Sequence, residues 1–281
     1  MTDARLIERA DGSQIALHHL AGDGPDPLLI SHATGFHGRC YTELAEGLSS
    51  RWTVWALDYS GHGISPAPSS PLTDWSPFAD DVLAVARTLA PEGGLAAFGH
   101  SMGGAAVLLA HLRDRSAFAR LVAFEPIAPP PTPGIDPDEL PIVKGAIRRR
   151  PGFESKIIAR ENYGSKPPLS TFTERCLSDY VEYGMHDTSQ AGALLNCTPE
   201  FEASVFRGAH TNDLWDRLPT IHLRTDVIMG IAAEHQPSAF APAVAQRLPN
   251  GSLHEHPEMD HFGPFVVPQA CAALVEGLLG G

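Results

Sequence analysis

A serine flanked by glycines is the clearest candidate for chemistry in this sequence. Residues 99–103 read GHSMG, which matches the G-x-S-x-G pattern that exposes a nucleophilic serine at a sharp strand-to-helix turn. The apolar run Leu95–Gly99 has the length of a buried strand, and the apolar stretch Met102–Leu112 has the length of a helix. The free N–H groups at the start of such a helix favour a developing negative charge. The pattern therefore predicts that Ser101 attacks a carbonyl carbon, rather than lying in an ordinary Gly-Ser turn.

The segments that would position this serine alternate between strand and helix patterns. After a hairpin around an Asp-Gly turn, short apolar runs typical of buried strands cover residues 27–31, 52–58, 95–99 and 120–125. Between them, apolar residues at helical spacing cover 41–48, 78–89 and 102–112. The alternation returns later, with strands at 225–229 and 252–256 and helices at 240–247 and 265–279. This order predicts an α/β fold with a mostly parallel sheet and helices on both faces.

The segment between these two parts has a different composition. Seven prolines crowd residues 126–141, which excludes a central strand or a long helix there. Residues 140–218 then show helical patterns and no convincing strand. We therefore predict a folded core made of residues 1–125 and 219–281, and a helical cap made of residues 126–218. Within the cap, the basic run Arg148–Arg150 is followed at once by a proline and is expected to be a solvated helix end.

The composition excludes several classes of partner. The 281 residues include 33 acidic and 20 basic side chains, so neither nucleic acid nor an anionic membrane surface is an expected partner. No apolar run reaches about 18 residues and the N-terminus lacks a signal-peptide core, so we expect a soluble, cytoplasmic protein with a small-molecule substrate. The four cysteines lack CxxC or zinc-site spacing, and no HExxH, GxGxxG or Walker motif indicates a metal or nucleotide. Formation of a homo-oligomer stays open at this stage.

Together with two further motifs, the serine segment resembles the α/β-hydrolase superfamily over nearly the whole chain. Residues 32–36 read HATGF and stand where that superfamily has an HG-type loop, with Ala33 in place of the usual glycine. Residues 58–65 read DYSGHGIS and are similar to its D-x-x-G-x-G-x-S turn, in which we interpret His62 as structural. The resemblance implies an oxyanion hole made by the backbone N–H groups of Thr34 and Met102.

The resemblance also implies the order serine, acid, histidine along the chain. Of the 14 histidines, His261 has the matching position, in a short loop before the last helix. The acid has two candidates. Glu125 ends a strand where some dehalogenases and lactonases of the superfamily carry theirs, whereas Glu234 lies one residue beyond the more usual place. We favour Glu125, keep Glu234 as the alternative acid, and leave open that neither serves.

The implied function is that of a serine hydrolase. The triad would cleave small-molecule esters, lactones or thioesters through an acyl-enzyme intermediate, without a cofactor or a metal. A serine at the elbow argues against the dehalogenases and epoxide hydrolases of the superfamily, which use aspartate. Two alternatives share the motifs. One is a cofactor-independent perhydrolase/haloperoxidase or C–C-bond hydrolase with the same triad, and the other is a non-catalytic small-molecule receptor with a vestigial triad.

Overall fold

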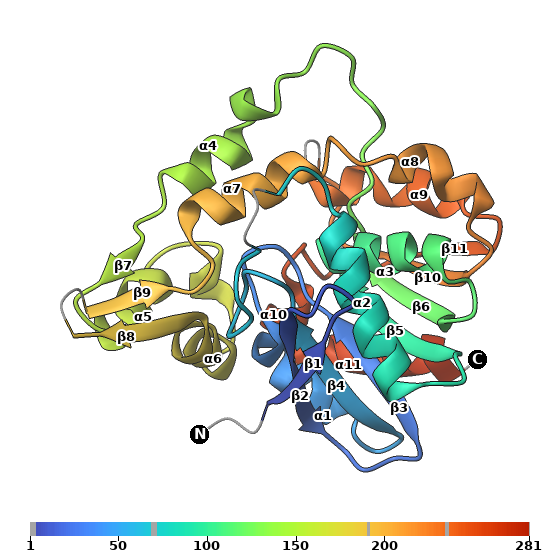
Figure 1. Ribbon diagram of the computed structural model, residues 1–281, viewed down its shortest axis with the longest axis horizontal. Helices are drawn as coiled ribbons and strands as arrows, with labels where there is room; N and C mark the ends of the chain where they lie inside the picture. Colours follow the sequence, from blue (N-terminus) through green and yellow to red (C-terminus); the bar gives the residue numbers. More distant parts are fainter. Residues whose placement is uncertain (1–3, 69–71, 190–191, 234–235, 281) are drawn as a thin grey trace.

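The main sheet of the molecule has eight strands in the order β1-β2-β4-β3-β5-β6-β10-β11 (Figure 1). The computed structural model describes residues 4–68, 72–189, 192–233 and 236–280. β1 and β2 form an antiparallel hairpin, β2 pairs antiparallel with β4, and every later pair is parallel. The predicted α/β fold class is therefore confirmed. The strand bounds are β1 Arg5–Glu8, β2 Gln14–Ala21, β3 Asp26–Ser31, β4 Trp52–Asp58, β5 Leu95–His100, β6 Phe118–Phe124, β10 Arg224–Met229 and β11 Gly251–Glu255.

Helices cover both faces of this sheet because its central strands are apolar on both sides. Successive residues of a strand point to opposite faces, so Leu28 and Ile30 pack in one apolar cluster and Leu29 packs in the other. The cluster with Leu29 is covered by α2 (Ser76–Leu89), α3 (Met102–Arg113) and α9 (Ala241–Arg247). The cluster with Leu28 is covered by α1 (Thr42–Leu48) and α11 (Pro268–Gly280).

The last predicted helix is two helices in the structure. α10 covers Gly263–Val266, and α11 begins at Pro268. Pro268 has no backbone N–H to continue the first helix, but its fixed φ suits the first turn of the next one. Short 3-10 helices complete the core at Gly38–Tyr41, Leu218–Thr220 and Pro237–Ala239.

Residues 126–218 form a second group of elements, which gathers beside and above the main sheet in Figure 1. Its helices are α4 (Pro141–Ile147), α5 (Lys156–Gly164), α6 (Glu174–Gly184), α7 (Pro199–Gly208) and α8 (Leu214–Arg217), with 3-10 turns at Pro137–Glu139 and Leu169–Thr171. The helix α8 packs on α3, and its residue Leu214 belongs to the apolar cluster of the main sheet.

The expectation that residues 140–218 contain no strand is wrong. Three antiparallel strands lie in this segment in the order β7-β9-β8, with bounds Gly152–Phe153, Gly192–Leu195 and Met185–Thr188. They are two to four residues long, too short for an alternating pattern to be recognised. The segment is therefore helical with a small sheet at its far end.

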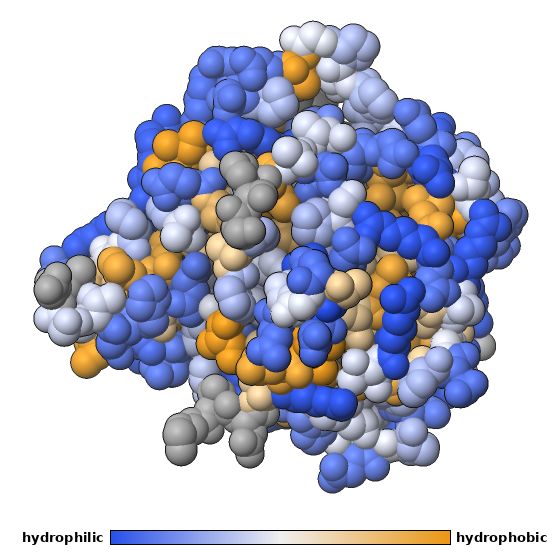
Figure 2. Space-filling model, viewed as in Figure 1, coloured by the Kyte–Doolittle hydropathy of each residue, from blue (hydrophilic) through white to orange (hydrophobic). Residues whose placement is uncertain are grey.

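The surface is mostly hydrophilic on the face drawn in Figure 2, with apolar residues in small separate patches. Within the described ranges, no helix has the length and apolar character needed to cross a membrane. The four cysteines are buried free thiols.

Candidate active site

Ser101 occupies the turn between β5 and α3, in a backbone conformation that few side chains adopt. Its φ is 57° and its ψ is −120°, and its N–H donates to the carbonyl oxygen of Phe124 on β6 at 2.9 Å. The flanking glycines make this turn sterically possible. A Cβ on Gly103 would lie 2.0 Å from the carbonyl oxygen of Ser31, and one on Gly99 would lie 2.5 Å from the backbone of α3. The sequence therefore folds into the strained elbow that its G-x-S-x-G pattern predicts.

Glu125 and His261 are hydrogen-bonded to each other at the carboxyl edge of the sheet. Glu125 Oε2 lies 2.6 Å from His261 Nδ1, and Glu125 Oε1 accepts the N–H of Gly230 at 2.9 Å. The Glu125 backbone has a φ of 44° directly after β6, and its N–H donates to the carbonyl oxygen of Ile228 on β10. With 1% of its surface exposed, this carboxylate is fixed on both oxygens and holds the imidazole with Nε2 facing away from it.

The atoms that would react are left free of structural contacts. Within the described parts of the chain, neither the Ser101 hydroxyl nor His261 Nε2 has a hydrogen-bond partner. Ser101 is a buried residue, with 8% of its surface exposed. The structure therefore shows the contact between Glu125 and His261 but no hydrogen bond between the Ser101 hydroxyl and His261 Nε2.

Two further acidic residues, Asp226 and Glu234, belong to β10 or follow it in the sequence. Glu234 lies outside the described residues, although Gly230, four residues earlier, contacts the Glu125 carboxylate. Asp226, the other carboxylate of that strand region, is bonded to His254 Nε2 at 2.8 Å and points into a contact between β10 and β11. Of the carboxylates that the structure describes, Glu125 is the one hydrogen-bonded to His261.

His32 sets the direction of the expected oxyanion-hole donor on Thr34. The His32 ring is fully buried, and its Nε2 accepts the N–H of Tyr59 at 3.0 Å. Its proton is therefore on Nδ1, which donates to the carbonyl oxygen of Ala33 at 2.8 Å. Because the Ala33 carbonyl and the Thr34 N–H belong to one planar peptide and point in opposite directions, fixing one orients the other. Burial, with the nearby His62 ring, lowers the pKa of His32 well below its usual value, which keeps the ring neutral.

Asp58, the last residue of β4, joins the loop after β4 to the 3-10 helix that follows residues 32–36, the expected oxyanion loop. Asp58 accepts hydrogen bonds from the Gly38 N–H, the Ile64 N–H and His18 Nε2, at 2.8 to 2.9 Å. Burial opposes its ionisation, but His18, His37 and the Ile64 N–H together outweigh that effect and hold the pKa of Asp58 below its usual value. Burial lowers the pKa of His62 to about 4, so this ring is neutral and is consistent with a structural role.

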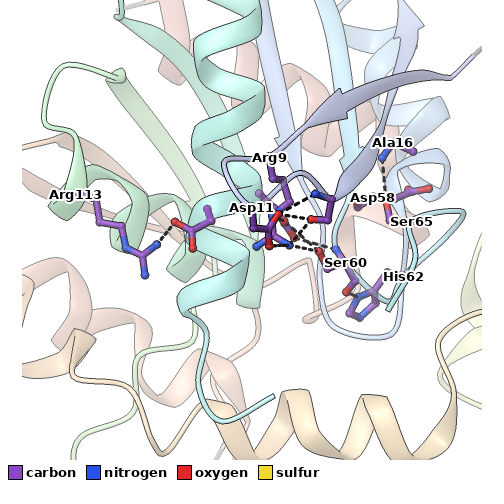
Figure 3. Close-up of polar contacts among 11 residues, drawn as sticks. Arg9, Asp11, Ala16, Asp58, Ser60, His62, Ser65 and Arg113 are labelled. Carbon is purple, nitrogen blue, oxygen red and sulfur yellow. Dashed lines mark hydrogen bonds and ion pairs between the residues drawn. The ribbon is translucent and has the colours of Figure 1, made fainter. Parts of the chain in front are cut away.

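Figure 3 shows how the same loop is tied to the N-terminal hairpin. Ser60 donates its N–H and its hydroxyl to the buried Asp81 of α2, and Arg9 Nε lies 3.0 Å from that carboxylate. At the other end of the loop, the Ser65 hydroxyl accepts the N–H of Ala16 on β2. Both ends of the loop are thus hydrogen-bonded to elements outside it.

An arginine that the sequence predicted to be in solvent binds Glu202, the residue by which the predicted cap approaches the oxyanion loop. Arg149 donates to Glu202 Oε2 at 2.5 Å and to the hydroxyls of Tyr180 and Tyr163 at 2.6 and 3.4 Å. The expectation of a solvated helix end is therefore wrong for Arg149, while both neighbours in the basic run are exposed. Glu202, on α7, lies so close to Gly35 that a Cβ there would be 2.2 Å from Glu202 Oε1. The cap thus rests directly on the residue after Thr34.

Aromatic side chains from three segments meet beside His261. Phe36 of the oxyanion loop contacts Phe172 of the cap, with ring centroids 6.0 Å apart, and stacks on Phe265 at 4.6 Å. Phe262, directly after the histidine, contacts Phe172 at 5.6 Å. Because Phe36 and Phe262 are only partly buried, these rings form an apolar wall close to the candidate triad.

A groove of about 870 Å³ runs along the seam between core and cap. Neither Ser101 nor His261 lines it, and sequence reasoning missed it because its walls come from distant segments. It is lined by Arg39, residues 63–67, Glu182, Tyr183, Met185, His186 and Asn196. Among the residues that the structure covers, no group of three or more His, Cys, Asp or Glu side chains is placed to hold a metal ion.

Several known proteins that resemble this chain are hydrolases by name. Residues 28–274 match the model of the alpha/beta hydrolase family. The chain is 26% identical over 278 residues to the 2-(acetamidomethylene)succinate hydrolase of Mesorhizobium japonicum, covering 95% of this chain and 93% of that enzyme. It is 32% identical over 131 residues to the monoglyceride lipase of Rattus norvegicus, and this match spans 43% of the lipase.

Solved structures show the same fold over the full length. The crystal structure of E-2-(acetamidomethylene)succinate hydrolase has a TM-score of 0.80, with 19% identity and all of both chains covered. An enol-lactonase from Burkholderia xenovorans has a TM-score of 0.72 at 18% identity, with 99% of this chain and 100% of that chain covered. At these identities the likeness concerns the fold of the chain.

Proposed function

The chain belongs to the alpha/beta hydrolase family, and we propose that it hydrolyses small-molecule esters, lactones or thioesters through an acyl-enzyme on Ser101. The observation that carries the proposal is the 2.6 Å hydrogen bond between Glu125 and His261 Nδ1, which leaves Nε2 to act as a base. A triad whose acid is fully buried and held on both oxygens is suited to catalysis. A receptor that only bound its ligand would not need that arrangement.

The proposed reaction has two balanced halves. In the first, Ser101 Oγ bonds to the carbonyl carbon while His261 Nε2 takes the hydroxyl proton, and the alcohol or thiol leaves with that proton. In the second, His261 takes a proton from water, the water oxygen attacks the acyl carbon, and Ser101 recovers its proton as the acid departs. Glu125 stabilises the imidazolium that forms in each half.

The oxyanion of each tetrahedral intermediate would be bound by two backbone N–H groups, those of Thr34 and Met102. Met102 is the first residue of α3, so its N–H has no partner within the helix. Thr34 is oriented through His32 and Ala33, as described above. Donors that are fixed before the reaction cost no reorganisation when the charge develops.

The substrate would be a small molecule that binds beneath the cap of residues 126–218. The contact of Glu202 with Gly35 and the aromatic wall around Phe172 support this location. The names of relatives point to different substrates, a monoglyceride in one and 2-(acetamidomethylene)succinate in another. The acyl preference is therefore best read from a substrate series.

Labelling and turnover test the proposal together. A fluorophosphonate probe should label Ser101 stoichiometrically, and the wild type should turn over members of a p-nitrophenyl ester series from acetate to decanoate. Ser101→Ala should lose labelling, and its turnover should fall by roughly 10³–10⁶-fold. Full activity of Ser101→Ala contradicts the acyl-enzyme. Labelling without turnover of any ester supports the receptor alternative, and peracid formation with hydrogen peroxide in place of hydrolysis supports a perhydrolase.

A further inference from the structure

A chain of three hydrogen bonds joins the oxyanion loop to the candidate base through two buried side chains. The Ala33 N–H lies 3.0 Å from the Tyr41 hydroxyl oxygen, and this oxygen lies 2.8 Å from His100 Nδ1. His100 Nε2 lies 2.9 Å from the carbonyl oxygen of His261. Tyr41 and His100 are fully buried, and they come from different elements, the 3-10 helix before α1 and the end of β5.

Each bond in this chain has one permitted direction. A backbone N–H can only donate, so the Tyr41 oxygen accepts from Ala33. A carbonyl oxygen can only accept, so His100 carries its proton on Nε2 and donates it to the His261 carbonyl. The Nδ1 of the neutral His100 ring is then an acceptor, and it receives the hydrogen of the Tyr41 hydroxyl. All three bonds thus run from the oxyanion loop toward the base.

The neutral state that this direction requires is the one that the surroundings favour. A second proton on His100 Nδ1 would face the hydrogen of the Tyr41 hydroxyl. Burial, with the adjacent His261 ring, lowers the pKa of His100 well below its usual value. The chain therefore persists at neutral pH.

We propose that Tyr41 and His100 are positioning residues, which hold the oxyanion loop and His261 in a fixed relation through this hydrogen-bond chain. The inference rests on the proposed function, since it assigns Thr34 and His261 to catalysis. Ala33 directly precedes Thr34, so a displaced Ala33 peptide moves the donor, and a displaced His261 main chain moves the base. Errors on the order of 1 Å at either end reduce catalysis while substrate binding is largely kept.

Two variants break the chain at different bonds. Tyr41→Phe keeps the ring that packs on Phe265 at 4.9 Å and removes the hydroxyl, which leaves Ala33 and His100 without their partner. His100→Asn keeps an acceptor for Tyr41 but removes the donor to the His261 carbonyl. The control is Tyr163→Phe, which removes the hydroxyl of another buried tyrosine, one that contacts Arg149 in the cap.

Tyr41→Phe and His100→Asn should each lower kcat for p-nitrophenyl acetate by about 10- to 100-fold and change KM less than about 3-fold. The double variant should be no slower than the slower single variant, because either change already interrupts the chain. In proton NMR, the downfield resonance of the His261–Glu125 hydrogen bond should broaden in both variants. Tyr163→Phe should keep kcat within about 2-fold of the wild type.

Three results would overturn the proposed positioning role of the hydrogen-bond chain. These are a folded Tyr41→Phe with wild-type kcat, additive losses in the double variant, or an equal loss in Tyr163→Phe. If Tyr41→Phe does not fold, His100→Asn decides by the same kinetic and NMR criteria. The proposed function fails separately, through an active Ser101→Ala, so the two failures are distinguishable.

Discussion

Glu125 and His261 stand 136 residues apart in the sequence and 2.6 Å apart in the structure, measured from carboxylate oxygen to ring nitrogen. Glu125 follows β6 and His261 follows β11, and β10 lies between these two strands in the sheet. All three strands are parallel, so their carboxyl ends meet at the same edge of the sheet. Carboxyl ends of parallel strands gather catalytic groups in open α/β sheets. The structure thus brings the favoured acid and the expected base together.

Glu125→Gln tests this pairing, because it keeps the shape of the side chain and removes its charge. We expect kcat to fall on the order of 10²–10⁴-fold with little change in folding, since the imidazolium loses its counter-charge. Steady-state kinetics with p-nitrophenyl acetate measures the loss. Glu258→Gln is the matched control, because Glu258 is also bonded to a histidine, His256 at 2.9 Å, but on the exposed surface. Equal activity of the two variants would argue against Glu125 as the acid.

Glu234→Gln tests the alternative acid in the same assay. Because Glu125 already occupies His261 Nδ1, we expect Glu234→Gln to lose less than about 10-fold in kcat. A large loss in Glu234→Gln together with an active Glu125→Gln would assign the acid to Glu234. If both variants keep full activity, another group holds His261.

Gly103→Ala should show how little space the elbow leaves. Its Cβ would lie 2.0 Å from the carbonyl oxygen of Ser31, a backbone atom that cannot rotate away, so α3 or β3 must shift. We expect the free energy of unfolding to fall by about 3 kcal/mol or more, as in severe overpacking. Gly277→Ala in α11 is the control, since nothing lies within 4 Å of its Cβ, and it should be neutral or stabilise slightly. Urea denaturation compares the two, and equal stability would contradict the steric argument.

The main sheet was predictable because buried parallel strands read as continuous apolar runs, as in Trp52–Asp58. The short strands β7 to β9 were not, because two to four residues carry no period. Arg149 was placed wrongly because its partner Glu202 lies 53 residues later and only tertiary packing brings the two together. The contacts of the Tyr41 hydroxyl could not be predicted from the sequence, because they join three segments that meet only in the folded chain.

The buried histidines predict that acid destabilises the protein. Burial lowers the pKa of His62 to about 4, against an ordinary value of 6.5, so the unfolded chain binds more protons between these values. The contribution of His62 to the free energy of unfolding is then fully present above about pH 6.5. It is lost as pH falls toward 4, by about 3 kcal/mol in total. His62→Gln should flatten this part of the stability–pH curve measured by urea denaturation. If the difference in free energy of unfolding between His62→Gln and the wild type is the same at pH 7 and pH 4.5, this assignment to His62 is wrong.

Asp81 should act in the opposite sense over nearly the same range. Burial raises its pKa to about 6, so the folded protein binds more protons than the unfolded chain between about pH 4 and 6. Stability from this group is present at low pH and falls as pH rises through 6. Asp81→Asn should therefore gain stability relative to the wild type as pH rises across this range, provided that its amide keeps the contact with Ser60. If Asp81→Asn instead loses stability relative to the wild type as pH rises, the ion pair with Arg9 lowers the pKa of Asp81 more than burial raises it.

Phe172→Ala tests whether the cap sets the acyl preference. The Phe172 ring lies between Phe36 and Phe262, at centroid distances of 6.0 and 5.6 Å, so its removal opens space beside the candidate base without touching Ser101 or Glu125. We expect the ratio of kcat/KM for p-nitrophenyl decanoate over acetate to rise by about 10-fold, the scale on which an apolar pocket discriminates chain length. Phe206→Ala is the control, because Phe206 packs against α4 inside the cap, and its ratio should stay within about 2-fold of the wild type. If the decanoate-to-acetate ratio of kcat/KM is equal in both variants, residues outside the cap select the acyl chain. If kcat/KM falls for all esters in Phe172→Ala, Phe172 belongs to the groups that support His261.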